Sequence, residues 1–222
     1  MIPLRDENPT ATIPYITVGL IIINCLVFFY ELSLGVYQTQ FFLHFGAIPH
    51  ELTQMTRLYA ETEASPAPLF LTPFTSMFIH GGIMHLVGNM LYLWIFGNNV
   101  EDVLGHATFL VFYLFCGLMA SLAHILADMD STVPMVGASG AIAGVLGAYF
   151  LLFPRARVIT LVIIFFFIRL VRLPAVFLLG FWFLLQLLNA GTSAGNVAWF
   201  AHIGGFLTGL IIVRILLRKV YR

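Results

Sequence analysis

Three polar residues in otherwise apolar segments of this 222-residue chain have the types and spacing of a hydrolytic site. Ser139 stands within a Gly-Ala-Ser-Gly sequence, His202 lies in a later apolar segment, and Asn89 follows His85 by four residues. A serine becomes a nucleophile when a neighbouring imidazole takes its proton, and N–H groups stabilise the oxyanion that then forms. This pattern predicts Ser139 and His202 as a nucleophile and its base, with Asn89 and His85 as candidate oxyanion donors.

Each of these residues also has a structural interpretation. A serine in a glycine-rich transmembrane helix is commonly a packing residue, and a lone histidine in such a helix can be a hydrogen-bonding residue of the bundle. At 100° per residue, His85 and Asn89 share a helix face, whereas His80 and His85 would lie about 140° apart, which suits a metal pair poorly. We therefore expect no metal or cofactor, and we expect His80 to pin the loop before the helix.

The composition requires a lipid bilayer around these residues. The chain is 60% hydrophobic and only 9% charged, whereas a soluble domain carries about 25% charged residues. Ten basic residues balance ten acidic ones, so the net charge points to no nucleic-acid partner. Cys25 and Cys116 sit within apolar runs and are interpreted as small hydrophobic residues.

The hydropathy pattern predicts an all-α, polytopic bundle of six transmembrane helices in a single domain covering residues 1–222. A span needs roughly 20 apolar residues, or fewer where the bilayer thins. A large polar loop follows the first span, from residue 35 to about 76, and residues 191–196 are expected to form a turn. The expected helices cover residues 13–34, 83–96, 107–127, 136–153, 174–188 and 197–217.

The stretch 158–188 is too long for one ordinary span and too short for two. We therefore place its β-branched and aromatic part, residues 158–168, at the membrane interface, before the fifth span. That span carries four aromatic residues that either gate lateral substrate entry or face the lipid, namely Phe177, Phe181, Trp182 and Phe183.

The distribution of basic residues predicts the orientation, because cytoplasmic loops are enriched in Lys and Arg. If both termini are cytoplasmic, only Arg57 lies outside. The other nine lie inside: Arg5, Arg155, Arg157, Arg169, Arg172, Arg214, Arg218, Lys219 and Arg222. In this orientation Asn89, Ser139 and His202 all lie roughly 5 to 9 Å below the outer boundary, at a common depth.

Small residues below the polar ones predict how the fourth and sixth spans meet. Gly205 and Gly209 share a face with His202, and Gly140 and Gly144 line the fourth span beside and below Ser139. Small faces allow close approach of two helices. Packing of these faces would bring the Ser139 hydroxyl and the His202 imidazole within hydrogen-bonding reach.

Taken in order, these motifs resemble the rhomboid intramembrane proteases, of the bacterial type, over about residues 74–209. The resemblance implies a six-helix serine endopeptidase that cuts in or next to transmembrane segments of membrane proteins. It further implies that Ser139 and His202 are catalytic, and that Asn89, His85 and the Ser139 N–H form the oxyanion hole. Packing of the sixth span on the fourth through Gly205 and Gly209 is implied as well.

Two family features are absent from this sequence. Many members carry a Trp-Arg pair shortly before the first histidine, where this chain reads Leu-Thr-Pro-Phe at 71–74. Some carry a tyrosine that stacks on the histidine, at the position that Ala143 occupies here; Trp199 or Phe200 are the candidates to replace it.

The expected partners are transmembrane protein substrates and membrane lipid, and the oligomeric state is left open. The expected location is the bacterial cytoplasmic membrane, with the site open to its outer face. Two rival functions are a catalytically inactive rhomboid-like protein that binds membrane proteins and a small membrane transporter. The retained Ser139 and His202 argue against the first, and the lack of charges at mid-membrane argues against the second.

Overall fold

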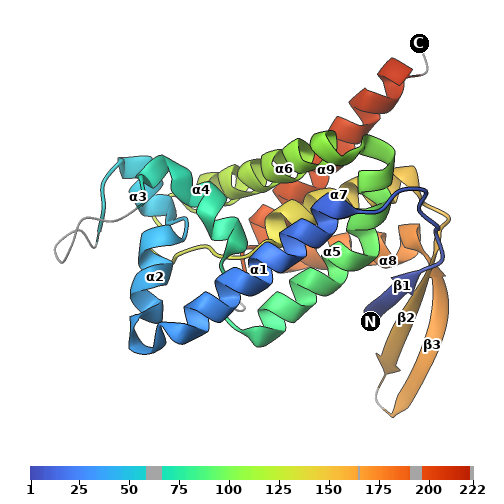
Figure 1. Cartoon of the computed structure of the whole chain (residues 1–222), viewed down its shortest axis with the longest axis horizontal. Helices are drawn as coiled ribbons and strands as arrows, with labels where there is room; N and C mark the ends of the chain where they lie inside the picture. Colours follow the sequence, from blue (N-terminus) through green and yellow to red (C-terminus); the bar gives the residue numbers. More distant parts are fainter. Residues whose placement is uncertain (59–66, 165, 191–196, 221–222) are drawn as a thin grey trace.

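The computed structural model of the chain describes residues 1–58, 67–164, 166–190 and 197–220. Long helices run side by side, with a small sheet at one end of the bundle and the short helices of the first loop at the other (Figure 1). Each of the six segments expected to be a span contains a helix, and the helical fold class is confirmed. The six are α1 (Tyr15–Ser33), α5 (Ile83–Leu104), α6 (His106–Ala127), α7 (Ser139–Leu152), α8 (Ala175–Asn189) and α9 (Trp199–Val220). The turn expected at residues 191–196 lies outside the described residues.

Helix lengths differ across the bundle. Among the described residues, α1, α6 and α9 are long and apolar enough to cross a membrane, and α5 is a fourth when counted with the bent segment before it. Helices α7 and α8 are apolar but have only 14 and 15 residues, or about 21 and 22 Å at 1.5 Å per residue. Among the six expected spans, the short helices are therefore α7 and α8. The span expected at residues 83–96 is instead part of a 22-residue helix.

Helix α5 extends past its expected end because its last turn is tied to the start of α1. Glu101 is fully buried and accepts hydrogen bonds from the backbone N–H groups of Ile16 (2.9 Å) and Thr17 (2.7 Å). A carboxylate at a helix N-terminus satisfies N–H groups that have no acceptor within the helix. The helix then stops at Gly105, whose φ of +75° favours glycine.

The first loop folds into short helices at the opposite end from the sheet. They are η1 (Gly35–Tyr37), α2 (Gln38–Phe45), α3 (Pro49–Gln54), η2 (Leu69–Leu71), α4 (Thr72–Thr75) and η3 (Ser76–Phe78). Arg57 lies 3.1 Å from the buried Glu51 carboxylate and donates to the Ala67 carbonyl (2.6 Å). This pair supplies a loop anchor in a chain that lacks the Trp-Arg pair.

A three-stranded antiparallel sheet, which the sequence analysis did not predict, occupies the other end. Strand β1 (Ile2–Asp6) pairs with β2 (Arg157–Ile164), which pairs with β3 (Phe167–Pro174). Of the stretch 158–168 that was placed at the interface, residues 158–164 therefore lie in β2 and residues 167–168 begin β3, as their β-branched and aromatic composition favours. Asp6 anchors β1 to the bundle by accepting hydrogen bonds from Tyr149 (2.6 Å) and Asn99 (2.8 Å). Burial raises the pKa of the Asp6 carboxyl, and these two bonds oppose that shift.

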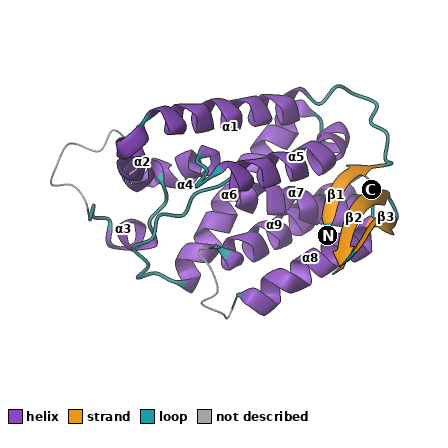
Figure 2. Cartoon of the chain, turned by 90° about the horizontal axis from the view of Figure 1, so that it is seen from below, coloured by secondary structure: helices purple, strands orange, loops and turns teal. Residues whose placement is uncertain are grey.

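Helix α7 occupies the centre of the bundle. In Figure 2, α1 lies at one edge, α8 at the opposite edge, and α7 and α9 lie between α5 and α8. Nearly all of α7 from Gly140 to Tyr149 is buried, and small residues dominate its surface. This helix consequently places its first residue, Ser139, inside the bundle.

Candidate active site

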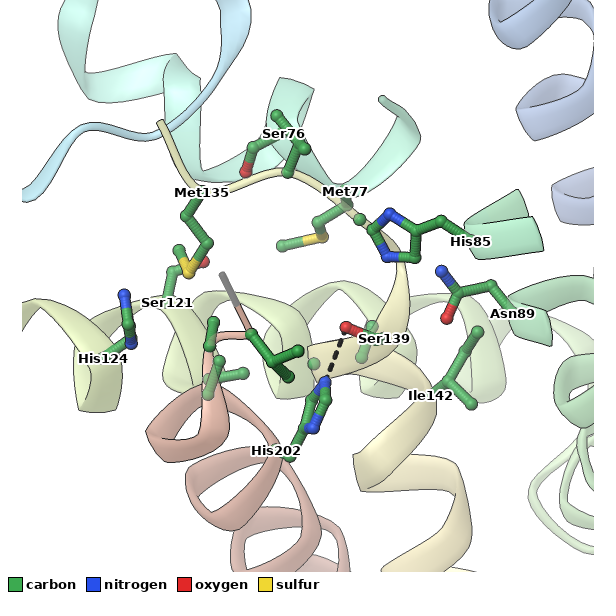
Figure 3. Close-up of a pocket in the computed structure, with 18 of the residues that line it drawn as sticks. Ser76, Met77, His85, Asn89, Ser121, His124, Met135, Ser139, Ile142 and His202 are labelled. Atoms are coloured by element: carbon green, nitrogen blue, oxygen red, sulfur yellow. Dashed lines mark hydrogen bonds between the residues drawn. The ribbon is translucent and has the colours of Figure 1, made fainter. Parts of the chain in front are cut away.

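Ser139 and His202 meet where α7 and α9 begin. Ser139 is the first residue of α7 and His202 lies in the first turn of α9. The distance from Ser139 Oγ to His202 Nε2 is 2.8 Å (Figure 3). That distance is within the range over which an imidazole accepts a hydroxyl proton. The structure thus brings together the two residues that sequence reasoning paired across 63 positions.

The backbone before Ser139 requires glycine. Gly137 has a φ of +126°, which L side chains rarely adopt, and a Cβ added there would lie 2.7 Å from the His85 ring. This turn lets the chain enter α7 with Ser139 at its first position. The N–H groups in the first turn of a helix lack acceptors within that helix, so they are available to an anion at this position.

His85 and Asn89 approach the same point from one face of α5 (Figure 3). Asn89 is buried, and its Nδ2 atom has no hydrogen-bond partner among the described residues. Buried amide groups are nearly always paired, so an unpaired donor in the wall of the cavity that Ser139 also lines fits a site for a transient oxyanion. His80 does not join this group; its backbone N–H donates to the buried Glu31 carboxylate (3.2 Å), and its ring packs edge-on against His85.

A cavity of about 960 Å³, lined by both polar and apolar side chains, connects these residues. It extends from the α8–α9 side, at Trp182 and Ala198, to exposed residues of the α6–α7 segment such as Val133. Such a volume exceeds that of a single water many times over, so water can reach a serine that lies among helices. The polar side chains in its wall include Ser76, His85, Asn89, Ser121, His124, Asp128, Ser131, Ser139 and His202.

Glycines make the contact between α7 and α9 close enough for the 2.8 Å pair. A Cβ added to Gly205 would lie 2.1 Å from the Gly140 carbonyl oxygen, and one added to Gly209 would lie 1.9 Å from the Gly144 carbonyl oxygen. Both distances are far below van der Waals contact, and both partners are backbone atoms that cannot rotate away. The four glycines expected to pack these helices therefore lie at their interface.

We expect Gly209→Ala to destabilise the protein by about 1 to 3 kcal/mol, because the added methyl must push two helix backbones apart. The contact between Ser139 and His202 should weaken with it, since the two residues sit on the two separated helices. Thermal unfolding in detergent measures the loss of stability. The matched control is Gly19→Ala in α1, where an added Cβ meets nothing within 4 Å. Equal melting temperatures for the two variants would contradict the prediction.

Comparison with known proteins places this geometry in a family. The model of the rhomboid domain matches residues 70–219, which include all four candidate site residues. The chain belongs to the rhomboid family. It is therefore an integral membrane protein, and the resemblance that its motifs predicted is confirmed.

Several rhomboid relatives align with about two thirds of this chain. Rhomboid protein 1, mitochondrial, of Saccharomyces cerevisiae is 34% identical over 61% of the chain, and Rhomboid protease GluP of Bacillus subtilis is 34% identical over 64%. RHOMBOID-like protein 6, mitochondrial, of Arabidopsis thaliana is 35% identical over 65%. These alignments cover only 39%, 25% and 43% of the relatives' own lengths. The similarity thus concerns the shared rhomboid domain.

Two residues of α8 contact His202 in this rhomboid site. Sequence reasoning missed Gln186, whose Oε1 lies 2.8 Å from His202 Nδ1, and named Trp182 only as a gate residue, whereas its ring is tilted against the imidazole with centroids 5.7 Å apart. Of the two candidates to replace the stacking tyrosine, Trp199 and Phe200, Trp199 contacts His202 edge-on at 6.2 Å. The signal available in the sequence was a glutamine within an otherwise apolar helix, because a polar group in such a helix needs a hydrogen-bond partner.

The aromatic residues of α8 divide between two environments. Phe177 and Phe181 are 70% and 46% exposed, as lipid-facing residues of a membrane helix are. Trp182 and Phe183 instead pack on Phe206 of α9, and the Phe183 ring stacks on it with centroids 4.4 Å apart. Two of the four candidate gate residues therefore pack against α9 instead of facing outward.

Proposed function

We propose that this rhomboid protein is an intramembrane serine endopeptidase. The observation that carries the proposal is the 2.8 Å contact between Ser139 Oγ and His202 Nε2 at the start of two adjoining helices. The substrates are transmembrane proteins, which are cut in or next to a membrane-spanning segment. Among the relatives, GluP carries the name of a rhomboid protease, which favours this reaction over binding or transport.

The reaction follows from what each side chain contributes. Ser139 Oγ attacks the scissile carbonyl carbon while His202 Nε2 takes the hydroxyl proton. The tetrahedral oxyanion accepts hydrogen bonds from Asn89 Nδ2, the Ser139 backbone N–H and His85. His202 then returns the proton to the leaving amine, and an acyl-enzyme on Ser139 remains. Water from the cavity, deprotonated by His202, hydrolyses that ester and restores the serine.

The bundle supports access for both water and substrate. Helices α7 and α8 are shorter than a ~30 Å hydrocarbon core, which favours local thinning of the bilayer beside the site. A substrate helix has no free backbone groups for the enzyme to bind. The substrate must therefore unwind near the cut, and residues that weaken helices should favour cleavage there.

The proposal is tested with purified wild-type protein in liposomes and a fluorogenic transmembrane peptide. Hydrolysis of the peptide bond, together with covalent labelling by a fluorophosphonate, is the expected result. A protein that binds the peptide without cutting it would instead be an inactive relative. Substrate flux across the liposome without cleavage would indicate a transporter.

The proposed orientation puts both termini in the cytoplasm of a bacterial cell, with the cavity mouth on the outer side of its cytoplasmic membrane. Its support is the segregation of charge. Arg5, Arg157 and Arg172 lie in the sheet, at the end of the bundle where α9 also ends, whereas Arg57 pairs with Glu51 of α3, which lies at the opposite end (Figure 1). Positive residues favour the cytoplasmic side.

We expect a tag at either terminus of the protein to be digested only when protease is given access to the cytoplasmic side. A tag between residues 61 and 66, which lie outside the described part of the chain, should be digested only from outside. Protease protection in spheroplasts and inverted vesicles measures both. Termini that are cleaved in intact spheroplasts would place the site on the cytoplasmic face.

A further inference from the structure

We propose that Gln186 is a positioning residue that holds His202 in the tautomer able to accept the Ser139 proton. The inference rests on the proposed peptidase function and deepens it. It replaces a dyad with a hydrogen-bonded chain of three residues, in which an amide occupies the place that a carboxylate fills in a soluble serine hydrolase.

A backbone carbonyl determines which way the Gln186 amide faces. The side chain is almost fully buried, and its Nε2 lies 2.8 Å from the carbonyl oxygen of Trp182, one turn earlier in α8. A carbonyl can only accept a hydrogen bond, so the atom facing it must be the NH₂ group. The atom facing His202 is therefore the amide oxygen, which can only accept.

The orientation of the Gln186 amide also determines which nitrogen of His202 carries the hydrogen. Since Gln186 Oε1 accepts, His202 Nδ1 must carry a hydrogen and donate it across the 2.8 Å contact. In a neutral imidazole the other nitrogen then has a free lone pair. That nitrogen, Nε2, lies 2.8 Å from Ser139 Oγ. The Trp182 carbonyl thus sets the orientation of the Gln186 amide, and that amide directs the free lone pair of His202 toward the serine proton.

An amide suits this position because the site lies within a membrane protein. A buried carboxylate would bear a charge that costs much to desolvate while the imidazole is neutral. The amide oxygen accepts the same hydrogen bond without a net charge, and its dipole still favours the imidazolium formed during the reaction. The Trp182 ring, 5.7 Å from the imidazole centroid, limits rotation of His202 on the same side.

Two substitutions separate this role from a structural one. Gln186→Met keeps the length of the side chain and removes the acceptor, whereas Gln186→Glu keeps an acceptor and can add a charge. The matched control is Asn189→Ala, which removes an amide that donates to the carbonyl four residues earlier in the same helix (2.7 Å). Among the described residues, the other titratable groups that interact electrostatically with His202 are His85 from α5 and His124 from α6, and all variants leave them unchanged.

We expect Gln186→Met to lower kcat about 10-fold, with KM within twofold of wild type, and to slow fluorophosphonate labelling in proportion. The acid limb of its pH–rate profile should move to lower pH, because the imidazolium loses a hydrogen-bond acceptor. Gln186→Glu should recover most of the rate and move the acid limb to higher pH, because a carboxylate favours the imidazolium. Asn189→Ala should match wild type in rate and profile.

Other results overturn the inference. A Gln186→Met variant with the kcat of wild type would contradict the inference. So would a Gln186→Met variant with a lower kcat but the labelling rate and acid limb of wild type, because that pattern indicates a role in substrate binding or packing. Failure of Gln186→Glu to recover the rate would also do so. A wild-type protein that neither cleaves nor labels would instead remove the proposed function, and this inference with it.

Discussion

Ser139→Ala should abolish peptide cleavage while leaving the fold intact. The substitution removes only the Oγ atom that lies 2.8 Å from His202 Nε2, and alanine suits the first turn of a helix whose surface is already made of small residues. Loss of a nucleophile typically lowers turnover by several orders of magnitude, to the level set by the remaining groups. The measurement is turnover of a transmembrane peptide in liposomes, with circular dichroism and melting temperature as checks of folding.

Two further variants define what that result means. Ser33→Ala, at the exposed end of α1, removes a hydroxyl bonded to its own helix (2.6 Å to Tyr30) and should cleave like wild type. His202→Ala should retain Ser139 but lose fluorophosphonate labelling, because the hydroxyl has no base. Wild-type turnover in pure Ser139→Ala protein would refute the proposed mechanism.

Asn89→Ala should lower kcat by about 10² to 10³ at nearly constant KM, or roughly 2.7 to 4 kcal/mol. The amide nitrogen is buried and has no partner among the described residues, so the resting protein loses no hydrogen bond there. Its contribution is realised only when an oxyanion forms, and an interaction made only in the transition state affects kcat. His85 and the Ser139 N–H can make the loss smaller by partial compensation.

Two further variants separate the shape of the Asn89 side chain from its hydrogen-bond donor. Asn89→Asp preserves the shape but replaces the donor with an acceptor, so its kcat should fall at least as far as that of Asn89→Ala. Asn98→Ala, on the same helix and near its other end, should have wild-type kcat. An increase in KM alone, or a much lower melting temperature, would show that Asn89 binds substrate or packs the bundle.

The sequence by itself determined the helical membrane fold and the family. Long apolar runs bounded by glycine, proline and charged residues predict where the helices lie, because in lipid the backbone N–H and C=O groups of each run must form hydrogen bonds with one another. It also predicted that Ser139 and His202 would meet, since small residues mark the faces of two helices that pack closely. Gly205 and Gly209 are such marks, and they lie against the backbone of α7.

Only the tertiary structure revealed the partners that have no repeating pattern in the sequence. Gln186 reaches His202 because α8 packs beside α9, and Glu101 reaches the start of α1 from the last turn of α5. Strand β1 pairs with β2 across more than 150 residues. Each of these contacts joins two separate helices or strands. Their meeting depends on how whole helices pack, which hydropathy and spacing within one segment do not encode.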